Sequence, residues 1–420
     1  MNIRFYNARI LTMKEAEDVF WGEVWVSNER IIYVGKQEDL EKEVEASGKE
    51  RPLWDREIDC KGNLLMPGFK NAHTHSGMTL LRSYADDLPL DEWLNTKIFP
   101  VEAKMTAEDI YELSKLAVLE YLTSGITAVF DMYLTPESIA RSFDDMGMRC
   151  VQVGAVNNFS QSPELVEEMY LKLNGKSPLQ SYMLGFHAEY TCSKELLSKI
   201  ASLAHKYQAP VFTHLAETEG EVAGCMERYG MTPMAFLDSL GMFDYGGGGY
   251  HCVYMTEDDI RIMKEKGLYA VTNPGSNTKL ASGIAPISEY LKAGVPVAIG
   301  TDGPSSNNCL DMFREMFLVT GLAKLKEKGI TTYIIRQKAL IPQSTLTKLK
   351  MCSGDSMEDI EKKLQEYKDS HNGKDFMCDV STKTIEDICQ LLQCQPQDLI
   401  DWKVDLKPEL AYENRFKESN

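Results

Sequence analysis

The stretch Pro67-Gly68-Phe69-Lys70-Asn71-Ala72-His73-Thr74-His75 decides how this chain is interpreted. Its two histidines stand one residue apart, after the apolar run Leu64-Leu65-Met66, where a β-strand is expected to end. Side chains at positions i and i+2 of a strand point to the same side. His73 and His75 can therefore direct two imidazoles at one point, an arrangement that suits a metal ion.

Eight apolar, strand-like runs alternate with helical patterns between about residues 61 and 321. The runs are Leu64–Met66, Ile126–Asp131, Arg149–Val156, Met183–His187, Pro210–His214, Gly249–Val253, Tyr269–Thr272 and Val295–Gly300. The helical patterns are clearest over 107–124 and 193–207. Alternating strands and helices, with both sheet faces covered, predict a parallel sheet. Eight such units favour an α/β fold of the (β/α)8 TIM-barrel type.

The chain is expected to divide into three parts. Residues 1–60 carry short β-rich runs separated by turn residues, such as Val24–Val26 and Ile31–Gly35, and are expected to form a small β-sheet domain. Residues 61–321 would form the barrel. Residues 322–420 are expected to be an all-helical C-terminal segment.

Polar residues end most of the expected barrel strands. They are His75, Asp131, His187, His214, His251 and Asp302. Barrel enzymes build their active sites from the carboxyl ends of the strands. Of the seven histidines in the chain, only His205 and His371 lie elsewhere, in helical or loop stretches, where we expect them to face solvent.

Composition limits the class of protein. With 45 basic and 63 acidic residues the formal charge is -18, so the chain as a whole is a poor ligand for polyanions. Its ten cysteines are scattered and form no Cys-x-x-Cys pair, which favours a reducing cytoplasm. The N-terminus does not resemble an export signal, and no apolar run approaches the ~20 residues that span a bilayer. A cytoplasmic protein without membrane contact is expected.

These residues resemble the amidohydrolase superfamily, in particular the 5-methylthioadenosine/S-adenosylhomocysteine deaminases and their chlorohydrolase-like relatives. The resemblance runs from residue 1 to about residue 320. The residues that carry it are Asn71–His75 with Met78–Arg82, Trp93-Leu94 with Pro100–Glu102, Phe186–Tyr190, His214–Thr218, Asn273–Asn277 with Gly283–Pro286, and Gly300–Gly303 with Ser306–Asn308. The resemblance implies hydrolytic deamination of a purine nucleoside, and it leaves homo-oligomerisation open.

Such a deamination needs a hydroxide nucleophile, and bound Zn²⁺ lowers the pKa of its water to about 7. His73, His75 and His214 would be neutral nitrogen ligands, and Asp302 an oxygen ligand. Three imidazoles and one carboxylate suit Zn²⁺ or Fe²⁺ better than Mg²⁺ or Ca²⁺. No lysine stands at the end of the fourth strand to be carboxylated and bridge two metals, so one metal per chain is expected.

Two further residues receive catalytic roles from the resemblance. Glu217 would move protons to the ring nitrogen and then to the leaving ammonia. His251 would hydrogen-bond the metal-bound hydroxide, and Asp302 would hold the proton of this hydroxide in addition to the metal. The plainer alternatives are an ordinary carboxylate at a helix start for Glu217 and a hydrogen-bonded core histidine for His251.

Substrate contacts also follow from the resemblance. Glu102 matches a position that holds ribose hydroxyls, His187 one that contacts the purine, and Trp93 belongs to the same set of motifs. Relatives that take S-adenosylhomocysteine pair its carboxylate with arginines on the third-strand segment. Residues 151–155 and 157–161 contain no arginine, so a bidentate carboxylate clamp is missing. A neutral adenosine-type substrate is favoured.

The C-terminal segment departs from the pattern of the family. Residues 325–349, 380–389 and 394–400 resemble, in that order, Cro/C1-type helix-turn-helix regulators, with an insertion at about 352–379 that contains a charged, helix-like run from Ser356 to Lys368. Residues 324–350 hold seven basic residues and one acidic residue, which suits phosphate contacts with DNA. Gln343 and Lys348 would belong to a recognition helix. The alternative is a helical extension that packs on the barrel.

The leading hypothesis is a metal-dependent deaminase of an adenosine-type nucleoside: methylthioadenosine, S-adenosylhomocysteine or adenosine. The first rival is hydrolysis of another aminated or halogenated heteroaromatic ring by a chlorohydrolase-like enzyme. The second rival is a DNA-binding regulator whose barrel senses a ligand or is inactive.

Overall fold

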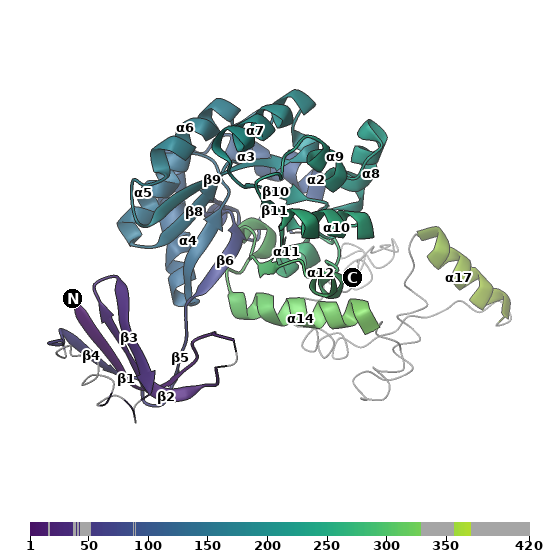
Figure 1. Ribbon diagram of the computed structural model, residues 1–420. Coiled ribbons are helices and arrows are strands. Elements are labelled where there is room, and N and C mark those ends of the chain that lie inside the picture. The colour runs from purple at the N-terminus through teal and green to yellow at the C-terminus, as the bar shows by residue number, and fades with distance from the viewer. Residues whose placement is uncertain are drawn as a thin grey trace, which may run out of the picture.

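The computed structural model describes residues 1–15, 17–36, 39, 42, 52–86, 88, 90–328 and 357–370. Figure 1 shows a small N-terminal sheet to one side of a barrel that is ringed by helices. Helix α17 (Met357–Ser370) covers the charged run that the sequence predicted to be helical. Residues 343–349 and 380–400, which resemble the helix-turn-helix, and His371 lie outside the described residues.

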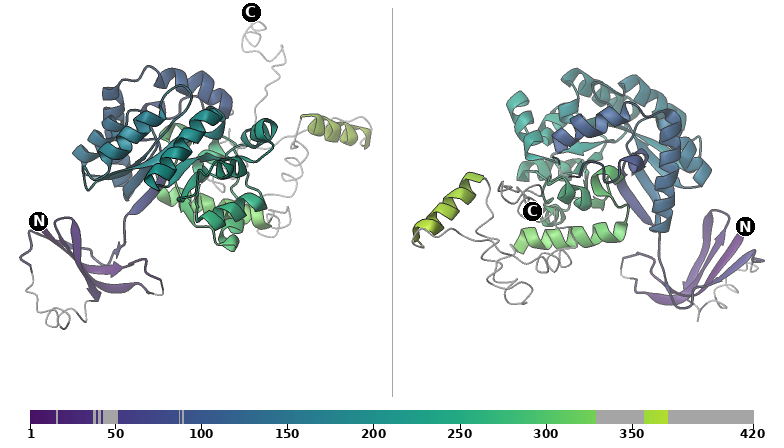
Figure 2. Two further views of the ribbon diagram at one scale, coloured as in Figure 1. Left: turned by 45° about the horizontal axis from the view of Figure 1, so that its top comes forward. Right: turned by 180° about the vertical axis from the view of Figure 1, so that it is seen from behind.

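The small sheet has five strands in the order β3-β2-β1-β4, with β5 also paired to β1. The strands are β1 (Asn2–Ile10), β2 (Phe20–Ser27), β3 (Arg30–Lys36), β4 (Arg56–Asp59) and β5 (Leu64–Leu65). Arg4 of β1 ties its neighbours together, because its guanidinium donates to Glu23 of β2 and, at 2.8 Å, to Glu57 of β4. A short link from β5 leads to the barrel (Figures 1 and 2).

The barrel contains eight strands, each paired in parallel with the next, which confirms the predicted α/β fold class. They are β6 (Phe69–Thr74), β7 (Ile126–Asp131), β8 (Arg149–Val153), β9 (Gln180–Ala188), β10 (Val211–Leu215), β11 (Gly247–His251), β12 (Tyr269–Thr272) and β13 (Val297–Ile299). Seven of the eight predicted runs overlap these strands.

The prediction for the first barrel strand is wrong. Leu64–Leu65 pairs with Arg9–Ile10 of β1 and belongs to the small sheet, four residues beyond its expected end. The first barrel strand is β6, whose mixed polar composition hides it from a search for apolar runs. His73 consequently lies within β6, and His75 follows directly after it.

The seam between β13 and β6 is held by hydrogen bonds. The Asn71 side chain accepts from the Thr301 backbone N–H at 2.9 Å and donates to the Thr301 hydroxyl at 2.7 Å. The Asp302 N–H donates to the His73 carbonyl at 3.0 Å. The strands approach so closely that a side chain at Gly300 would lie 2.8 Å from the His73 Cβ. The first and last barrel strands are therefore joined where His73 and Asp302 meet.

Helices follow the strands around the outside of the barrel. They are α4 (Ala107–Thr123), α5 (Pro136–Met146), α6 (Pro163–Leu173), α7 (Lys194–Tyr207), α8 (Glu219–Tyr229), α9 (Pro233–Ser239), α10 (Glu257–Lys266), α12 (Ile287–Ala293) and α14 (Met312–Lys328). Shorter helices follow strand ends: η1 (Ser76–Leu81), α2 (Leu90–Trp93), η2 (Leu94–Ile98), α3 (Phe99–Glu102), η3 (Glu189–Thr191), α11 (Pro274–Lys279) and α13 (Pro304–Asn307). Local sequence sets the boundaries, as in α10, where Thr256 and Asp259 form a capping box and Gly267 ends the helix in the left-handed conformation.

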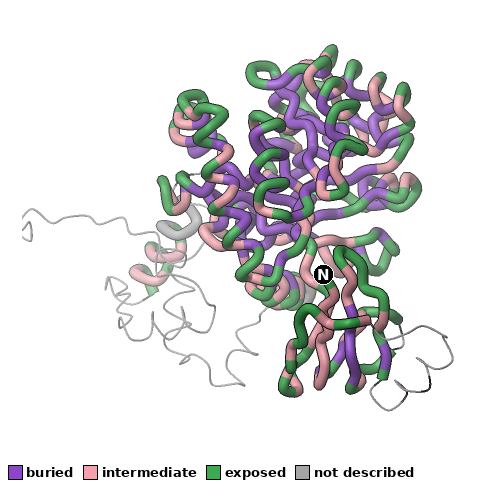
Figure 3. The backbone as a smooth tube through the Cα atoms, turned by 90° about the vertical axis from the view of Figure 1, so that its left-hand side faces the viewer, coloured by how far each residue is buried: buried purple, intermediate pink, exposed green. Residues whose placement is uncertain are grey.

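Apolar side chains fill both the barrel and the layer between barrel and helices. Inside the barrel, Phe212, Tyr250 and Val271 pack together. Figure 3 shows buried backbone concentrated in the barrel and exposed backbone on the outer helix faces. Among the described residues, none of the helices is long and apolar enough to cross a bilayer.

Candidate functional site

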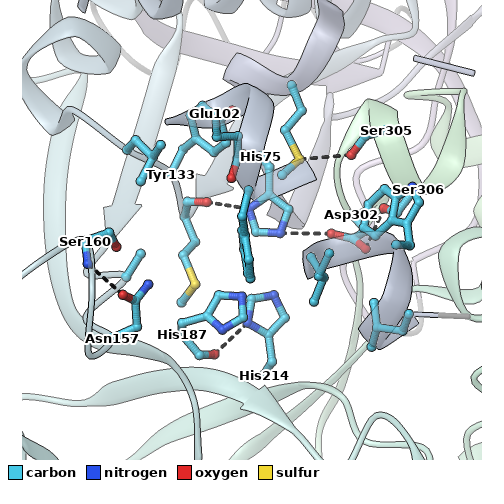
Figure 4. Close-up of a pocket in the computed structure, with 18 of the residues that line it drawn as sticks. His75, Glu102, Tyr133, Asn157, Ser160, His187, His214, Asp302, Ser305 and Ser306 are labelled. Carbon is cyan, nitrogen blue, oxygen red and sulfur yellow. Dashed lines mark hydrogen bonds and ion pairs between the residues drawn. The ribbon is translucent and has the colours of Figure 1, made fainter. Parts of the chain in front are cut away.

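Four strands bring histidines and a carboxylate to the carboxyl end of the barrel. His73 comes from β6, which His75 directly follows, His214 comes from β10, His251 from β11, and Asp302 follows β13. One ligand atom each from His73, His75 and His214 lies within 4.8 Å of the others, and the same holds for His73, His251 and Asp302. Figure 4 shows His75, His214 and Asp302 turned toward a shared space.

Backbone carbonyls orient two of the imidazoles. Nδ1 of His75 hydrogen-bonds the Met132 carbonyl, and Nδ1 of His214 hydrogen-bonds the His187 carbonyl at 2.6 Å (Figure 4). Because a carbonyl oxygen only accepts, Nδ1 must carry the proton in both rings. When either ring is neutral, its Nε2 lone pair is therefore the one available to a cation.

Buried atoms without partners lie at the same place. His73 is fully buried and stacked on Tyr250 at 3.7 Å, yet neither of its ring nitrogens has a hydrogen-bond partner among the described residues. Oδ1 of Asp302 also has none within the described part, although it lies 3.1 Å from Nε2 of His75 and 3.4 Å from Nε2 of His73. Unpaired buried polar atoms are costly, so this set of donors fits a metal ion.

The charge distribution fits the same conclusion. Burial lowers the pKa of His73 to about 3, and burial with the neighbouring histidines holds the pKa of His214 well below its usual value. Burial would raise the pKa of Asp302, but the adjacent rings of His73 and His75 hold it well below the ordinary range. Neutral His73 and His214 beside an ionised Asp302 are the ligand states that a divalent metal requires. His75 differs, because the carboxylate of Asp302 outweighs the effect of burial and raises the pKa of this ring to about 9, so a metal would displace a proton from it.

Asp302 is held in a strained backbone conformation. Its φ is +59°, in the left-handed region that non-glycine residues rarely adopt, at a cost of roughly 1–3 kcal/mol. Its Oδ2 accepts hydrogen bonds from the hydroxyls of Ser276 and Ser306, both at 2.7 Å. These two bonds fix the carboxylate so that only Oδ1 faces the histidines. His251 and Ala216, with φ of +68° and +49°, are strained in the same way beside the site.

Glu217 lies beside the histidines and is itself held in place. It is buried, its Oε1 accepts from the Ser282 hydroxyl at 3.0 Å, and its Oε2 lies 3.5 Å from Nε2 of His251. Glu221 of α8 accepts from the backbone N–H groups of Ala216 and Glu217, both at 2.8 Å. Burial raises the pKa of Glu217, which favours a carboxyl that gains and loses a proton easily.

His251 is fixed from the opposite side of its ring. Nδ1 donates to Oδ1 of Asn277 at 2.7 Å, which leaves Nε2 directed at Glu217. The side chain is almost fully buried, 1% exposed. The arrangement suits a ring that hydrogen-bonds a group placed between itself and the carboxyl of Glu217.

A pocket opens from these residues, and the three expected substrate contacts line it. Burial raises the pKa of Glu102 to about 7, and its Oε1 has no hydrogen-bond partner among the described residues. His187 hydrogen-bonds Thr191 through Nδ1 at 3.1 Å, and burial lowers its pKa to about 4. Trp93 is 3% exposed. All three could therefore contact a ligand that also reaches Glu217.

Two other polar residues considered in the sequence lie away from this cluster. Asp131 accepts from the backbone N–H of Ser76 at 3.1 Å and is in neither metal-ligating group of the described residues. His205 is half-exposed and pairs with Asp244 at 3.2 Å, as expected for a surface histidine.

Sequence reasoning missed several residues that shape the site. Ser282 and Glu221 hold Glu217, while Phe99, Tyr133 and Phe159 line the pocket. Glu221 carried one signal, because it stands one helical turn after Glu217. The phenylalanines and Tyr133 carried none, because an aromatic side chain in a loop or a short helix is equally compatible with packing in the core.

The Amidohydrolase family matches residues 64–334, and the Cro/C1-type HTH DNA-binding domain matches residues 372–405. Among curated proteins, a 5-methylthioadenosine/S-adenosylhomocysteine deaminase of Caldicellulosiruptor saccharolyticus is 39% identical over 331 residues, 79% of this chain and 75% of that protein. The protein of the same name from Desulfitobacterium hafniense is 41% identical over 346 residues, 80% of this chain and 78% of that one.

Among solved structures, an adenosine deaminase from Xanthomonas campestris with bound zinc is similar, with 34% identity and a TM-score of 0.71. The similarity covers 78% of this chain and 74% of that one.

Proposed function

We propose that this chain, which belongs to the amidohydrolase family, is a hydrolase of carbon–nitrogen bonds in cyclic amidines that releases the amino group of an adenosine-type nucleoside as ammonia. One observation carries the proposal: buried ring nitrogens of His73 and a buried carboxylate oxygen of Asp302, unpaired among the described residues, lie beside a buried Glu217 at the inner end of a pocket. The names of the deaminase relatives support the substrate class.

His73, His75, His214 and Asp302 would hold one divalent metal. Imidazole nitrogens favour Zn²⁺, with Fe²⁺ second, over metals that prefer oxygen ligands. When bound, such a metal lowers the pKa of a coordinated water from 15.7 to about 7 and so supplies a nucleophile at neutral pH.

Glu217 would move the protons of the reaction. Deamination adds water across the purine C6–N1 bond and then breaks the C6–N bond to the amino group. The buried carboxyl of Glu217 can accept a proton from the attacking water, give it to N1, and later help to protonate the leaving amine. His251, fixed by Asn277, would hydrogen-bond the attacking oxygen, and Asp302 would accept its second proton.

Glu102, His187 and Trp93 would contact the substrate. The unpaired Oε1 of Glu102 suits ribose hydroxyls, which can donate to it. His187 lies between the metal-ligating residues and the outer pocket, where its ring can contact the purine (Figure 4). The buried Trp93 offers an apolar wall with one unpaired donor, Nε1, within the described residues.

The test is ammonia release from adenosine, methylthioadenosine and S-adenosylhomocysteine by protein with a measured metal content. We expect turnover of at least one nucleoside and its loss with a chelator. A chlorinated triazine, assayed for halide, serves as the comparison substrate. Fully metal-loaded protein that turns over none of the nucleosides would contradict the proposal.

We also propose that the tail contacts duplex DNA. The helix-turn-helix match over 372–405 supports this, together with the excess of basic residues between 324 and 350. Affinity for a duplex should fall with salt, with a slope of about -0.9 for each phosphate contact. Lys338→Ala and Lys348→Ala should weaken binding, whereas Lys61→Ala, in the turn between β4 and β5, should not. Absence of binding at low salt would refute this role.

A further inference from the structure

The outer end of the pocket is apolar and carries no positive charge. Figure 4 places Asn157 and Ser160 across the pocket from Asp302 and Ser306, so the loop between them forms the far wall. The apolar side chains that line the pocket include Leu90, Trp93, Leu94, Phe99, Leu134 and Phe159. The charged lining residues in the described part of the chain are Glu102, Glu217 and Asp302, with neither lysine nor arginine among them.

Phe159 is the most unusual residue of this wall. Its side chain is 64% exposed although it lines the pocket, and it meets Phe99 edge-to-face with ring centroids 5.4 Å apart. Phe99 in turn lies 6.3 Å from the ring of His187. The rings of His187, Phe99 and Phe159 thus lie one after another from the candidate metal ligands toward solvent. Because Phe159 lines the pocket and contacts Phe99, its exposed ring adds apolar surface at the pocket entrance.

The loop that carries Phe159 is fixed. Oδ1 of Asn157 accepts from the backbone N–H groups of Phe159 at 2.9 Å and Ser160 at 2.8 Å. Gln161 donates from its side chain to the Tyr133 carbonyl at 3.0 Å. Asn158 joins the loop to the next strand end, because its N–H donates to the Thr191 carbonyl at 3.0 Å. Phe159 is therefore presented at the pocket mouth by a preorganised loop.

Two cations that lie close to lining residues, Lys279 and Arg82, are already paired. Lys279 donates to the carbonyl of Ser305, a lining residue, at 2.8 Å and pairs with Asp86 at 2.6 Å. Arg82 pairs with Glu120 and donates to the Asn308 carbonyl at 2.6 Å. Neither is available to a ligand without breaking these contacts.

We propose that Phe159, with Phe99, determines specificity by selecting an uncharged, apolar 5′ substituent on the nucleoside. This inference rests on the proposed deaminase function. With the purine C6 at Glu217 and the ribose near Glu102, the 5′ group of an extended nucleoside reaches the aromatic pair. A methylthio group buries its surface there. An amino-acid carboxylate would lie beside two phenyl rings and near the carboxyl of Glu102, and no lysine or arginine is among the described lining residues to pair with it.

The test compares kcat/KM for methylthioadenosine, S-adenosylhomocysteine and 5′-butylthioadenosine, which matches the length of the homocysteine arm without its charges. Methylthioadenosine and butylthioadenosine should both exceed S-adenosylhomocysteine by about tenfold or more. Phe159→Arg should raise kcat/KM for S-adenosylhomocysteine about fivefold or more by supplying a bidentate partner for the carboxylate. Phe159→Met, of similar reach but uncharged, should leave the preference in place.

The outcomes separate the two proposals. Equal kcat/KM for methylthioadenosine and S-adenosylhomocysteine would overturn the selection by Phe159 and leave the deaminase function intact. Poor turnover of butylthioadenosine would also overturn it, because length would then explain the preference. No turnover of any nucleoside by metal-loaded protein would overturn both. The comparison of kcat/KM among the three nucleosides needs only the unaltered protein, so it tests the preference for an uncharged 5′ substituent even where a variant folds poorly.

Discussion

Replacing Glu217 with glutamine removes one ionisable group and little else. Glutamine has the same length, and its amide oxygen can still accept from the Ser282 hydroxyl, which now lies 3.0 Å from Oε1. The amide N–H₂ would face Nε2 of His251, 3.5 Å from the present Oε2. None of the proposed metal ligands changes. Glu217→Gln should therefore bind a full complement of metal.

The rate should fall because an amide cannot carry the proton. A positioned general acid–base group contributes about 10²- to 10⁴-fold, which corresponds to about 3–5 kcal/mol in the activation free energy. We expect a fall in kcat within this range. KM should change by much less, because Glu217 acts on the reacting atoms and not on the ribose or its 5′ group.

The assay is initial-rate ammonia release with metal content measured on the same sample. Glu219→Gln is the matched control, because Glu219 is an exposed glutamate at the start of α8, two residues away, and its removal should leave kcat unchanged. A Glu217→Gln protein that retains kcat within threefold of the original would refute proton transfer by this residue. Loss of metal in Glu217→Gln would refute the separation of its role from metal binding.

Three further predictions concern the ligands, the support of Glu217 and stability. His73→Ala and Asp302→Ala should each lower metal affinity by about tenfold or more, and full retention of metal would exclude these residues as ligands. Glu221→Ala leaves two buried N–H groups unpaired, at about 1–3 kcal/mol each, and should lower kcat about 10- to 100-fold with metal retained. Glu221→Gln keeps one acceptor and should restore part of this kcat. Equal loss of kcat in both variants would argue against a positioning role. Burial raises the pKa of Glu315 to about 7 from an ordinary 4.5, so the folded protein keeps a proton that the unfolded chain releases. The unfolding free energy should then fall by about 3 kcal/mol between pH 4.5 and 7, and denaturant titrations of Glu315→Gln should lack this component; an unchanged slope would contradict it.

The sequence was sufficient to locate the site residues where an apolar run ends in a polar residue. β10 ends beside His214, β11 at His251, and β13 just before Asp302, so the pattern of one polar residue after an apolar strand located the side chains that meet at the barrel mouth. The parallel sheet could be predicted for the same reason, since buried strands are uniformly apolar.

The sequence did not predict features that depend on individual hydrogen bonds. β6 contains both polar and apolar residues, and the side chain of its Asn71 hydrogen-bonds Thr301 across the seam. Its composition therefore does not mark it as a barrel strand. The contact between the Met132 carbonyl and His75 involves a backbone atom, which no residue type reveals. Phe159 could not be assigned either, because its exposure at the pocket mouth depends on the hydrogen bonds of Asn157.

The most direct test of the central claim is a titration of metal-free protein with Zn²⁺, followed by ammonia release from methylthioadenosine. We predict that activity rises linearly with added metal and reaches its maximum at about one metal per chain, because the two candidate ligand groups of the described residues share His73 and so mark one site. Activity that is complete in metal-free protein, or absent in protein carrying one equivalent, would contradict a metal-dependent deaminase.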